Sequence, residues 1–217
     1  MERGISLERA ITLVKIEKLN LSLESVNLEN AYGRILGNGL KSKVDDPRFD
    51  NSAMDGWAVR KEDFSPNENT SLEIVGTSQA GSSKTFTISS GQACKIMTGA
   101  QIPKGANAIV MIEESEIDGN NVIISGPARD TYIRHKGENL LKGKKALSIG
   151  NFMDPASISL AATMGYESIE VFRKPVIGII STGDELVMPG SKIKDWEIYE
   201  SNSFGIAALV QKMGGEA

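Results

Sequence analysis

The sequence has few of the residues that many enzymes rely on for chemistry. Among its 217 residues there is one cysteine, Cys94, and one histidine, His135. A single cysteine excludes an internal disulfide and a cysteine-based zinc cluster. A single histidine argues against a histidine metal site or a Ser-His-Asp triad within one chain. Aromatic residues make up only 6%. No apolar run approaches the ~18 residues of a membrane helix, and the N-terminus lacks the apolar centre of a signal peptide.

An excess of positive charge is also missing. The chain has 24 basic and 28 acidic residues, with a net charge of -4, and no basic stretch is interleaved with aromatics. This balance argues against binding to nucleic acid or to an anionic membrane. Hydrophobic residues at 40% and charged residues at 24% are typical of a globular protein. We therefore expect a reduced, soluble, cytoplasmic protein.

The N-terminal segment predicts a helix followed by a short strand. Ser6 is a suitable N-cap, and the helix is expected to end near residues 19–20. The apolar positions follow i, i+4, i+7 spacing: Leu7, Ile11, Val14. A strand at 24–28 and a helical turn at 30–36 are expected next.

The middle of the chain predicts a mostly β module. Short apolar runs are separated there by Gly, Pro, Asn and Ser. The expected strands are 72–75, 93–97, 108–112, 122–124 and 131–133. The Asp-Gly-Asn-Asn sequence at 118–121 is a hairpin-turn signal.

The last third predicts a helix and then the beginning of an α/β domain. Asp154 can cap a helix that ends before Gly165. The nearly continuous apolar run at 176–180 is typical of a buried parallel strand, and 202–213 of a helix. One βα unit cannot bury both faces of its sheet, so we interpret 175–217 as the truncated start of a larger domain.

The first polar stretch of interest is rich in aspartate. Four aspartates lie within eleven residues, beside Asn51 and Ser52: Asp45, Asp46, Asp50, Asp55. Clustered carboxylates can bind a hard cation such as Mg²⁺. Asp and Asn also form turns by capping neighbouring backbone, and composition alone leaves both interpretations open.

Two further stretches could bind an anion. At 96–110, backbone N–H groups around Thr98 could face an anion with Lys104 nearby, or the segment is only a surface loop. At 134–136, an Arg-His-Lys run precedes Gly-Glu-Asn, and it is either an oxyanion site or a solvated strand end.

The fourth stretch, STGDEL at 181–186, follows the predicted parallel strand. Open α/β sheets bind ligands at this end of their strands. Ser181, Thr182 and the backbone of Gly183 offer hydrogen-bond donors, while Asp184 and Glu185 offer cation ligands or a general base.

Taken in order, five stretches resemble the molybdopterin molybdenumtransferases, the family that includes the E domain of gephyrin. The matching stretches are DNSAMDGWAV, MTGAQIPKGANAIV, RHKGEN, STGDEL and IYESN. The first has Trp57 where the family has Tyr. The third has Asn139 where the family usually has Asp, which removes a charge and weakens the expectation of a metal or base role there.

The resemblance implies an activity and a set of site residues. Such enzymes cleave adenylylated molybdopterin, release AMP and insert molybdate, usually with Mg²⁺. By motif position, Asp55 and Glu185 are the expected catalytic residues; no metal ligands are assigned. The expected substrate-binding residues are Asn51, Ser52, Thr98, Glu138, Asn139, Ser181, Thr182, Gly183 and Asp184.

The resemblance also implies an α+β multidomain fold. An extended α/β dimerisation domain would comprise 1–42 and 142–173, with a β-rich domain inserted at 43–141. The truncated start of a doubly wound, molybdopterin-binding α/β domain would occupy 174–217. The family forms homodimers. The alternative function is a non-catalytic scaffold or assembly module that shares the fold, as the clustering role of gephyrin illustrates.

Overall fold

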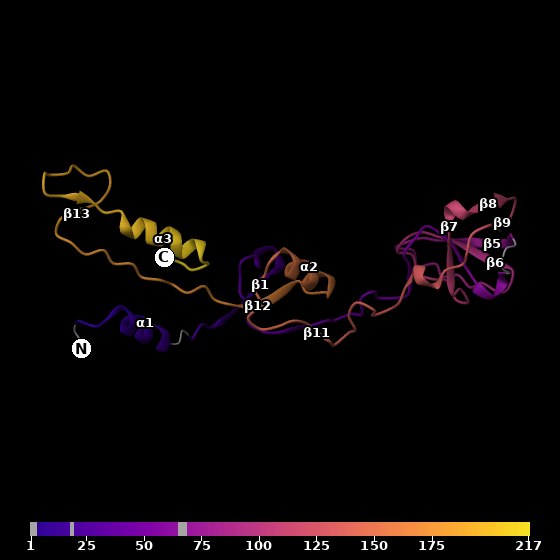
Figure 1. Cartoon of the computed structure of the whole chain (residues 1–217), viewed down its shortest axis with the longest axis horizontal. Coiled ribbons are helices and arrows are strands. Elements are labelled where there is room, and N and C mark those ends of the chain that lie inside the picture. The colour runs from indigo at the N-terminus through magenta and orange to yellow at the C-terminus, as the bar shows by residue number, and fades with distance from the viewer. Residues whose placement is uncertain (1–3, 18–19, 65–68) are drawn as a thin grey trace. The chain divides into compact units, whose positions relative to one another are not determined.

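Helices and strands are mixed along the chain, which makes this a mixed α/β protein (Figure 1). The computed structural model describes residues 4–17, 20–64 and 69–217. The helices are α1 (Leu7–Ile16), α2 (Pro155–Thr163) and α3 (Asn202–Lys212). The strands are β1 (Leu23–Asn27), β2 (Leu40–Lys41), β3 (Asn51–Ser52), β4 (Gly56–Val59), β5 (Thr70–Ser78), β6 (Gln92–Ile96), β7 (Ala108–Met111), β8 (Ser115–Asp118), β9 (Asn121–Ile124), β10 (Ile133–Arg134), β11 (Lys145–Leu147), β12 (Ser168–Phe172), β13 (Leu186–Val187) and β14 (Ile198–Tyr199).

The chain divides into two compact units, each built from separate stretches of sequence. The first unit contains Met1–Leu40, Leu147–Ala162 and Tyr166–Ala217. The second contains Lys41–Ala146 and Thr163–Gly165. The boundary predicted at residue 174 falls inside the first unit and stays a prediction.

The second unit is built on a six-stranded sheet with the order β7-β4-β6-β5-β9-β8 (Figure 1). All neighbouring pairs are antiparallel except β5 and β6, which are parallel. All four residues of β4 are buried, and this strand lies between β7 and β6, one strand in from the edge of the sheet. The β module predicted from the spacing of short apolar runs is confirmed.

Local details of this module agree with most of the sequence signals. The predicted hairpin turn joins β8 and β9, with Asp118 paired to Asn121 and Gly119 at φ 59°. The strand predicted at 131–133 is wrong by position. Asp130–Tyr132 forms a 3₁₀ helix, and the strand that follows, β10, pairs with β3.

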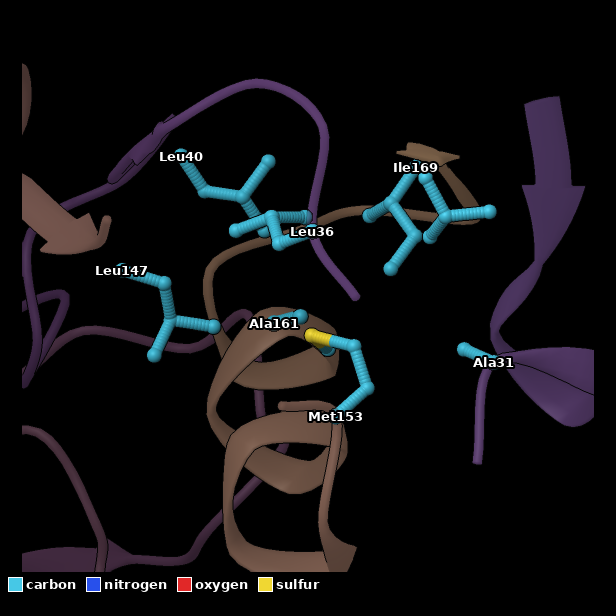
Figure 2. Close-up of a cluster of buried hydrophobic side chains, with 8 residues drawn as sticks. Ala31, Leu36, Leu40, Leu147, Met153, Ala161 and Ile169 are labelled. Atoms are coloured by element: carbon cyan, nitrogen blue, oxygen red, sulfur yellow. The ribbon is translucent and has the colours of Figure 1, made fainter. Parts of the chain in front are cut away.

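The core of the first unit joins α2 to the antiparallel strands β1 and β12 (Figure 1). The buried cluster consists of Ala31, Leu36, Leu40, Leu147, Met153, Ala161, Ile169 and Val171. Figure 2 shows seven of these side chains labelled, with Ala161 on the helix and Met153 beside it. The N-cap prediction is confirmed, since the Asp154 carboxylate accepts a hydrogen bond from the Ser157 N–H at 2.7 Å.

The predicted N-terminal helix is present as α1. The Ser6 hydroxyl accepts a hydrogen bond from the Arg9 N–H at 3.2 Å, as an N-cap should. The helix ends at Ile16, earlier than predicted, and residue 19 of the predicted end lies outside the described residues. None of its residues is buried.

The helical turn predicted at 30–36 is wrong. A 3₁₀ helix covers Leu28–Asn30, and a turn follows at 32–33. Ile35 and Leu36 form antiparallel bridges with Phe152 and Val171. Tertiary pairing therefore overrides the local preference for a turn of helix.

The buried parallel strand predicted at 176–180 is also wrong. In the described part of the chain these residues form no strand, although Val176 makes a bridge to Glu216. Val176 and Ile180 are 76% and 87% exposed. A parallel strand needs neighbours to bond to, and within 175–217 the described parallel pair of strands is β13 with β14. The helix predicted at 202–213 is confirmed as α3.

Within the described ranges, no helix combines the length and apolarity needed to cross a bilayer.

Candidate functional site

Asp55 immediately precedes strand β4, and the fold brings Thr98 to it. Antiparallel pairing places Gly56 opposite Ile96, so the residues beyond these two strand ends meet. The Thr98 backbone N–H and its hydroxyl both donate to Asp55 Oδ1, at 2.6 and 2.8 Å. These two hydrogen bonds lower the pKa of Asp55. The carboxylate is therefore both ionised and fixed in orientation, at an exposed position.

Backbone hydrogen bonds of strand β3 (Asn51–Ser52) join the first motif, DNSAMDGWAV, to the second, MTGAQIPKGANAIV. The Ser52 N–H donates to Ala100 O at 3.1 Å, and the Gly99 N–H donates to Ser52 O at 2.8 Å. Ser52 is fully buried, and its hydroxyl donates to Met54 O at 2.6 Å within its own turn. The expected role of Asn51 and Ser52 in substrate binding stays a prediction; in this structure their backbone holds the Thr98 loop in place.

Asp50 connects the first motif to the third. Its carboxylate accepts a hydrogen bond from the Lys136 N–H at 2.7 Å and lies 3.4 Å from His135 Nδ1. Its carbonyl accepts a hydrogen bond from the Ile102 N–H at 3.0 Å, which adds the second motif. The three sequence motifs of this unit therefore meet around 50–55.

The Gly-Glu-Asn segment forms a turn that faces the beginning of the aspartate-rich stretch. Glu138 accepts a hydrogen bond from the His135 N–H at 2.7 Å. Asn139 Nδ2 donates to Asp46 Oδ2 at 3.1 Å, and its N–H donates to Asp46 O at 3.0 Å. An aspartate at position 139 would place a second carboxylate against that of Asp46. The neutral amide of Asn139 avoids this repulsion and is favoured beside the Asp46 carboxylate.

Asp45 has a structural role in the same turn. Its carboxylate accepts a hydrogen bond from the Lys142 N–H at 2.8 Å and forms an ion pair with Lys136 Nζ at 3.3 Å. These donors, the Lys142 N–H first, lower the pKa of Asp45.

The four aspartates do not converge on one point. In the described ranges, no three side chains of His, Cys, Asp or Glu are grouped so that they could hold a metal ion. Three of the carboxylates instead accept hydrogen bonds from separate residues of the 136–142 segment, and that of Asp55 accepts from Thr98. The described residues therefore form no metal cluster of their own, and cation binding by the aspartate-rich stretch stays a prediction.

The STGDEL motif lies in the first unit, whereas the other three stretches meet within the second unit. All of Ser181–Glu185 is exposed. The Glu185 carbonyl accepts a hydrogen bond from the Ile198 N–H at 2.8 Å, which anchors the loop to β14. Gly183 has φ 153°, and a Cβ there would lie 2.7 Å from the Glu185 carboxylate oxygens. Any residue larger than glycine at position 183 would thus crowd the carboxylate of Glu185, the predicted catalytic residue.

Glu200 is the polar residue of this region that sequence reasoning did not assign to a site. It is only 5% exposed, and its carboxylate accepts hydrogen bonds from the Ser181 hydroxyl and the Ser203 N–H, each at 2.7 Å. The Ser203 contact spans three residues at a helix start, but Glu is not among the residues preferred as caps, so no clear capping signal for it was present in the sequence. The Ser181 contact spans nineteen residues and had no local signal.

Comparisons with known proteins agree on one family. The family model described as the MoeA N-terminal region (domain I and II) matches residues 5–165. A molybdopterin molybdenumtransferase of Nostoc sp. is 38% identical over 197 residues, covering 89% of this chain and 45% of that protein. A protein of the same name from Haemophilus influenzae is 36% identical over 192 residues, covering 88% and 47%.

A solved structure of the molybdopterin biosynthesis moeA protein from Pyrococcus horikoshii OT3 is similar in fold. Its TM-score is 0.84 at 34% identity, with 90% of this chain and 53% of that chain covered. The chain thus spans about half the length of the relatives it matches.

Proposed function

The chain belongs to the MoeA N-terminal family, and on that premise we propose that it is the N-terminal part of a molybdopterin molybdenumtransferase. The proposed activity is the insertion of molybdate into adenylylated molybdopterin with release of AMP, a step of molybdenum cofactor biosynthesis in the cytoplasm. The relatives named for this activity support the proposal. The observation that carries it is the Asp55 carboxylate, held by two donors of Thr98 where three motifs meet.

The environment of Asp55 favours a charge-based role over proton abstraction. A carboxylate whose pKa is lowered is a weak base at neutral pH, because its ionised form is stabilised and it accepts a proton less readily. A fixed negative charge can instead orient a water molecule or a cationic group beside the phosphoanhydride. Thr98 then serves to hold Asp55 Oδ1, and its hydroxyl is already used as a donor in that bond.

The exposed loop Ser181–Glu185 of the first unit holds a second group of proposed site residues. Glu185 is the proposed second catalytic acid, and Ser181, Thr182, Gly183 and Asp184 are the proposed substrate contacts. Glu138 and Asn139 are proposed substrate contacts in the second unit. Mg²⁺ is the proposed divalent cation, since one or two carboxylates together with substrate phosphates can bind it.

The test compares this chain with a longer protein that also contains the segment matching the C-terminal half of the relatives. Each is incubated with adenylylated molybdopterin, molybdate and Mg²⁺, and AMP release is followed. We expect the longer protein to release AMP and the 217-residue chain to remain at background. AMP release by neither protein would contradict the proposed enzyme activity and favour the non-catalytic scaffold. Equal release by both would contradict the need for the additional segment.

We further propose that the protein is a homodimer, with α1 at the contact. Its apolar side chains are uncovered, with Leu7 and Val14 72% and 74% exposed. Light scattering should report twice the 23.3 kDa chain mass. Leu7→Gln with Val14→Gln should shift the mass to the monomer, while the neighbouring control Lys15→Gln should not. A monomeric parent would contradict the assignment.

A further inference from the structure

Glu200 is a buried carboxylate that the proposed chemistry does not use. It follows β14, and its N–H donates to Val187 O at 2.9 Å, continuing the parallel pairing of β14 with β13. The side chain turns inward and is 5% exposed. Burying an ionised group costs free energy unless donors surround it, so the contacts of this carboxylate define its role.

The carboxylate of Glu200 joins two segments. On one side it accepts hydrogen bonds from the Ser203 N–H at 2.7 Å and from the Ser203 hydroxyl, at the beginning of α3. On the other side it accepts a hydrogen bond from the Ser181 hydroxyl at 2.7 Å. Ser181 is the first residue of the loop that carries Glu185.

A helix cap alone does not account for this arrangement. Capping needs a side-chain oxygen on the first-turn N–H groups, and short side chains such as Ser, Thr, Asp and Asn are preferred for it. The longer side chain of Glu200 reaches the helix start and also a residue nineteen positions earlier. These three donors lower the pKa of Glu200, the Ser203 contacts most, so the tie is made by a charged acceptor.

The geometry points to Glu200 as a positioning residue that sets the loop 181–186 relative to α3. It acts through Ser181 and is not itself a proposed reacting group. The inference rests on the proposed function, because the loop matters for turnover only if Glu185 does. Its structural part can be tested without that assumption.

The first test is amide hydrogen exchange on the 217-residue chain, which needs no substrate. Glu200→Gln and Ser181→Ala should each speed exchange of the 181–186 amides by roughly ten- to a hundredfold, the value of a lost charge-assisted hydrogen bond. Ser203→Ala is the matched control, since it removes another hydroxyl donor to the same carboxylate and should affect only the first turn of α3. Unchanged loop exchange in Glu200→Gln, or an equal effect of Ser203→Ala, would overturn the inference.

The second test uses AMP release by the longer protein. Glu200→Gln should lower kcat about tenfold or more with KM within about twofold, and its double variant with Ser181→Ala should lose no more kcat than the poorer single variant. If the kcat losses of the two single variants multiply in the double variant, the two residues act independently, and the inference is overturned. A parent without AMP release would defeat the proposed function, while hydrogen exchange would still decide the positioning role.

Discussion

Gly56→Ala is expected to damage the sheet that carries Asp55. Gly56 is buried in β4 opposite Met111 of β7. A Cβ at this position would lie 1.9 Å from Val110 O and 2.9 Å from Val110 C. Since contacts under 3.0 Å essentially never occur for a Cβ, the neighbouring backbone would have to move by about 1 Å or more. A ladder hydrogen bond of ~2.9 Å cannot stretch that far and remain a good bond.

The magnitude follows from these losses. Two weakened backbone hydrogen bonds cost about 1 kcal/mol each, and forced displacement in a packed sheet adds about 1–3 kcal/mol. Alanine restricts the unfolded chain and returns about 0.4–1 kcal/mol. The free energy of unfolding of the second unit should therefore fall by about 3 kcal/mol.

Urea denaturation followed by tryptophan fluorescence measures this loss. Trp57 is 1% exposed in the same strand, whereas Trp196 is 70% exposed, so a Trp196→Phe background isolates the signal of the sheet. Gly178→Ala is the control, because nothing lies within 4 Å of a Cβ there, and it should change stability by less than about 0.5 kcal/mol. A Gly56→Ala loss below about 1 kcal/mol would refute the steric reasoning.

Three other outcomes are expected. Thr98→Val should raise the pKa of Asp55 toward its ordinary value, as followed by carboxyl NMR, and an unchanged pKa would contradict the hydrogen bonds. A folded-state pKa below the unfolded one stabilises the protein above the unfolded pKa, and this stabilisation is lost as pH falls. The variant should therefore lose less stability on acidification than the parent. Asn139→Asp should create a pair of carboxyl groups with Asp46 in which one pKa is raised. The variant protein should therefore be destabilised most at neutral pH, and the loss should be relieved as pH falls through that raised pKa. A pH-independent effect in thermal unfolding would contradict this. Met153→Ala, at a fully buried position, should cost about 2–5 kcal/mol of stability in the first unit by calorimetry, and a cost below about 1 kcal/mol would show that the core there is loose.

Local signals in the sequence predicted the elements whose stabilising contacts are also local. The caps at Ser6 and Asp154 each accept from a backbone N–H three residues later, so the pattern could be read from adjacent residues. The hairpin at 118–121 depends on a glycine at positive φ. Such elements form wherever the short pattern occurs, and their prediction succeeded for that reason.

Elements that depend on distant partners were not predictable in the same way. The apolar run at 176–180 has the composition of a buried strand, but burial requires neighbouring strands that the described residues do not supply. The contact between Asp55 and Thr98 joins residues 43 positions apart, and it exists because β4 and β6 pair. The pairing of Asn139 with Asp46 depends likewise on tertiary structure. Motif resemblance indicated these residues, whereas their geometry came from the fold.

The most direct test of the proposed function is Asp55→Asn in the longer protein. The amide keeps the volume and can still accept the Thr98 hydrogen bonds through its oxygen, but it removes the fixed negative charge. Asp130→Asn, which breaks the exposed pair with Lys61 away from the motifs, is the control for a lost surface carboxylate. Thermal unfolding and AMP-release kinetics are measured on the same preparations. We predict near-parental unfolding for both variants, parental turnover for Asp130→Asn, and a loss of about 10²-fold or more in kcat for Asp55→Asn. Parental turnover by Asp55→Asn would show that this carboxylate only shapes its turn, and would contradict the account.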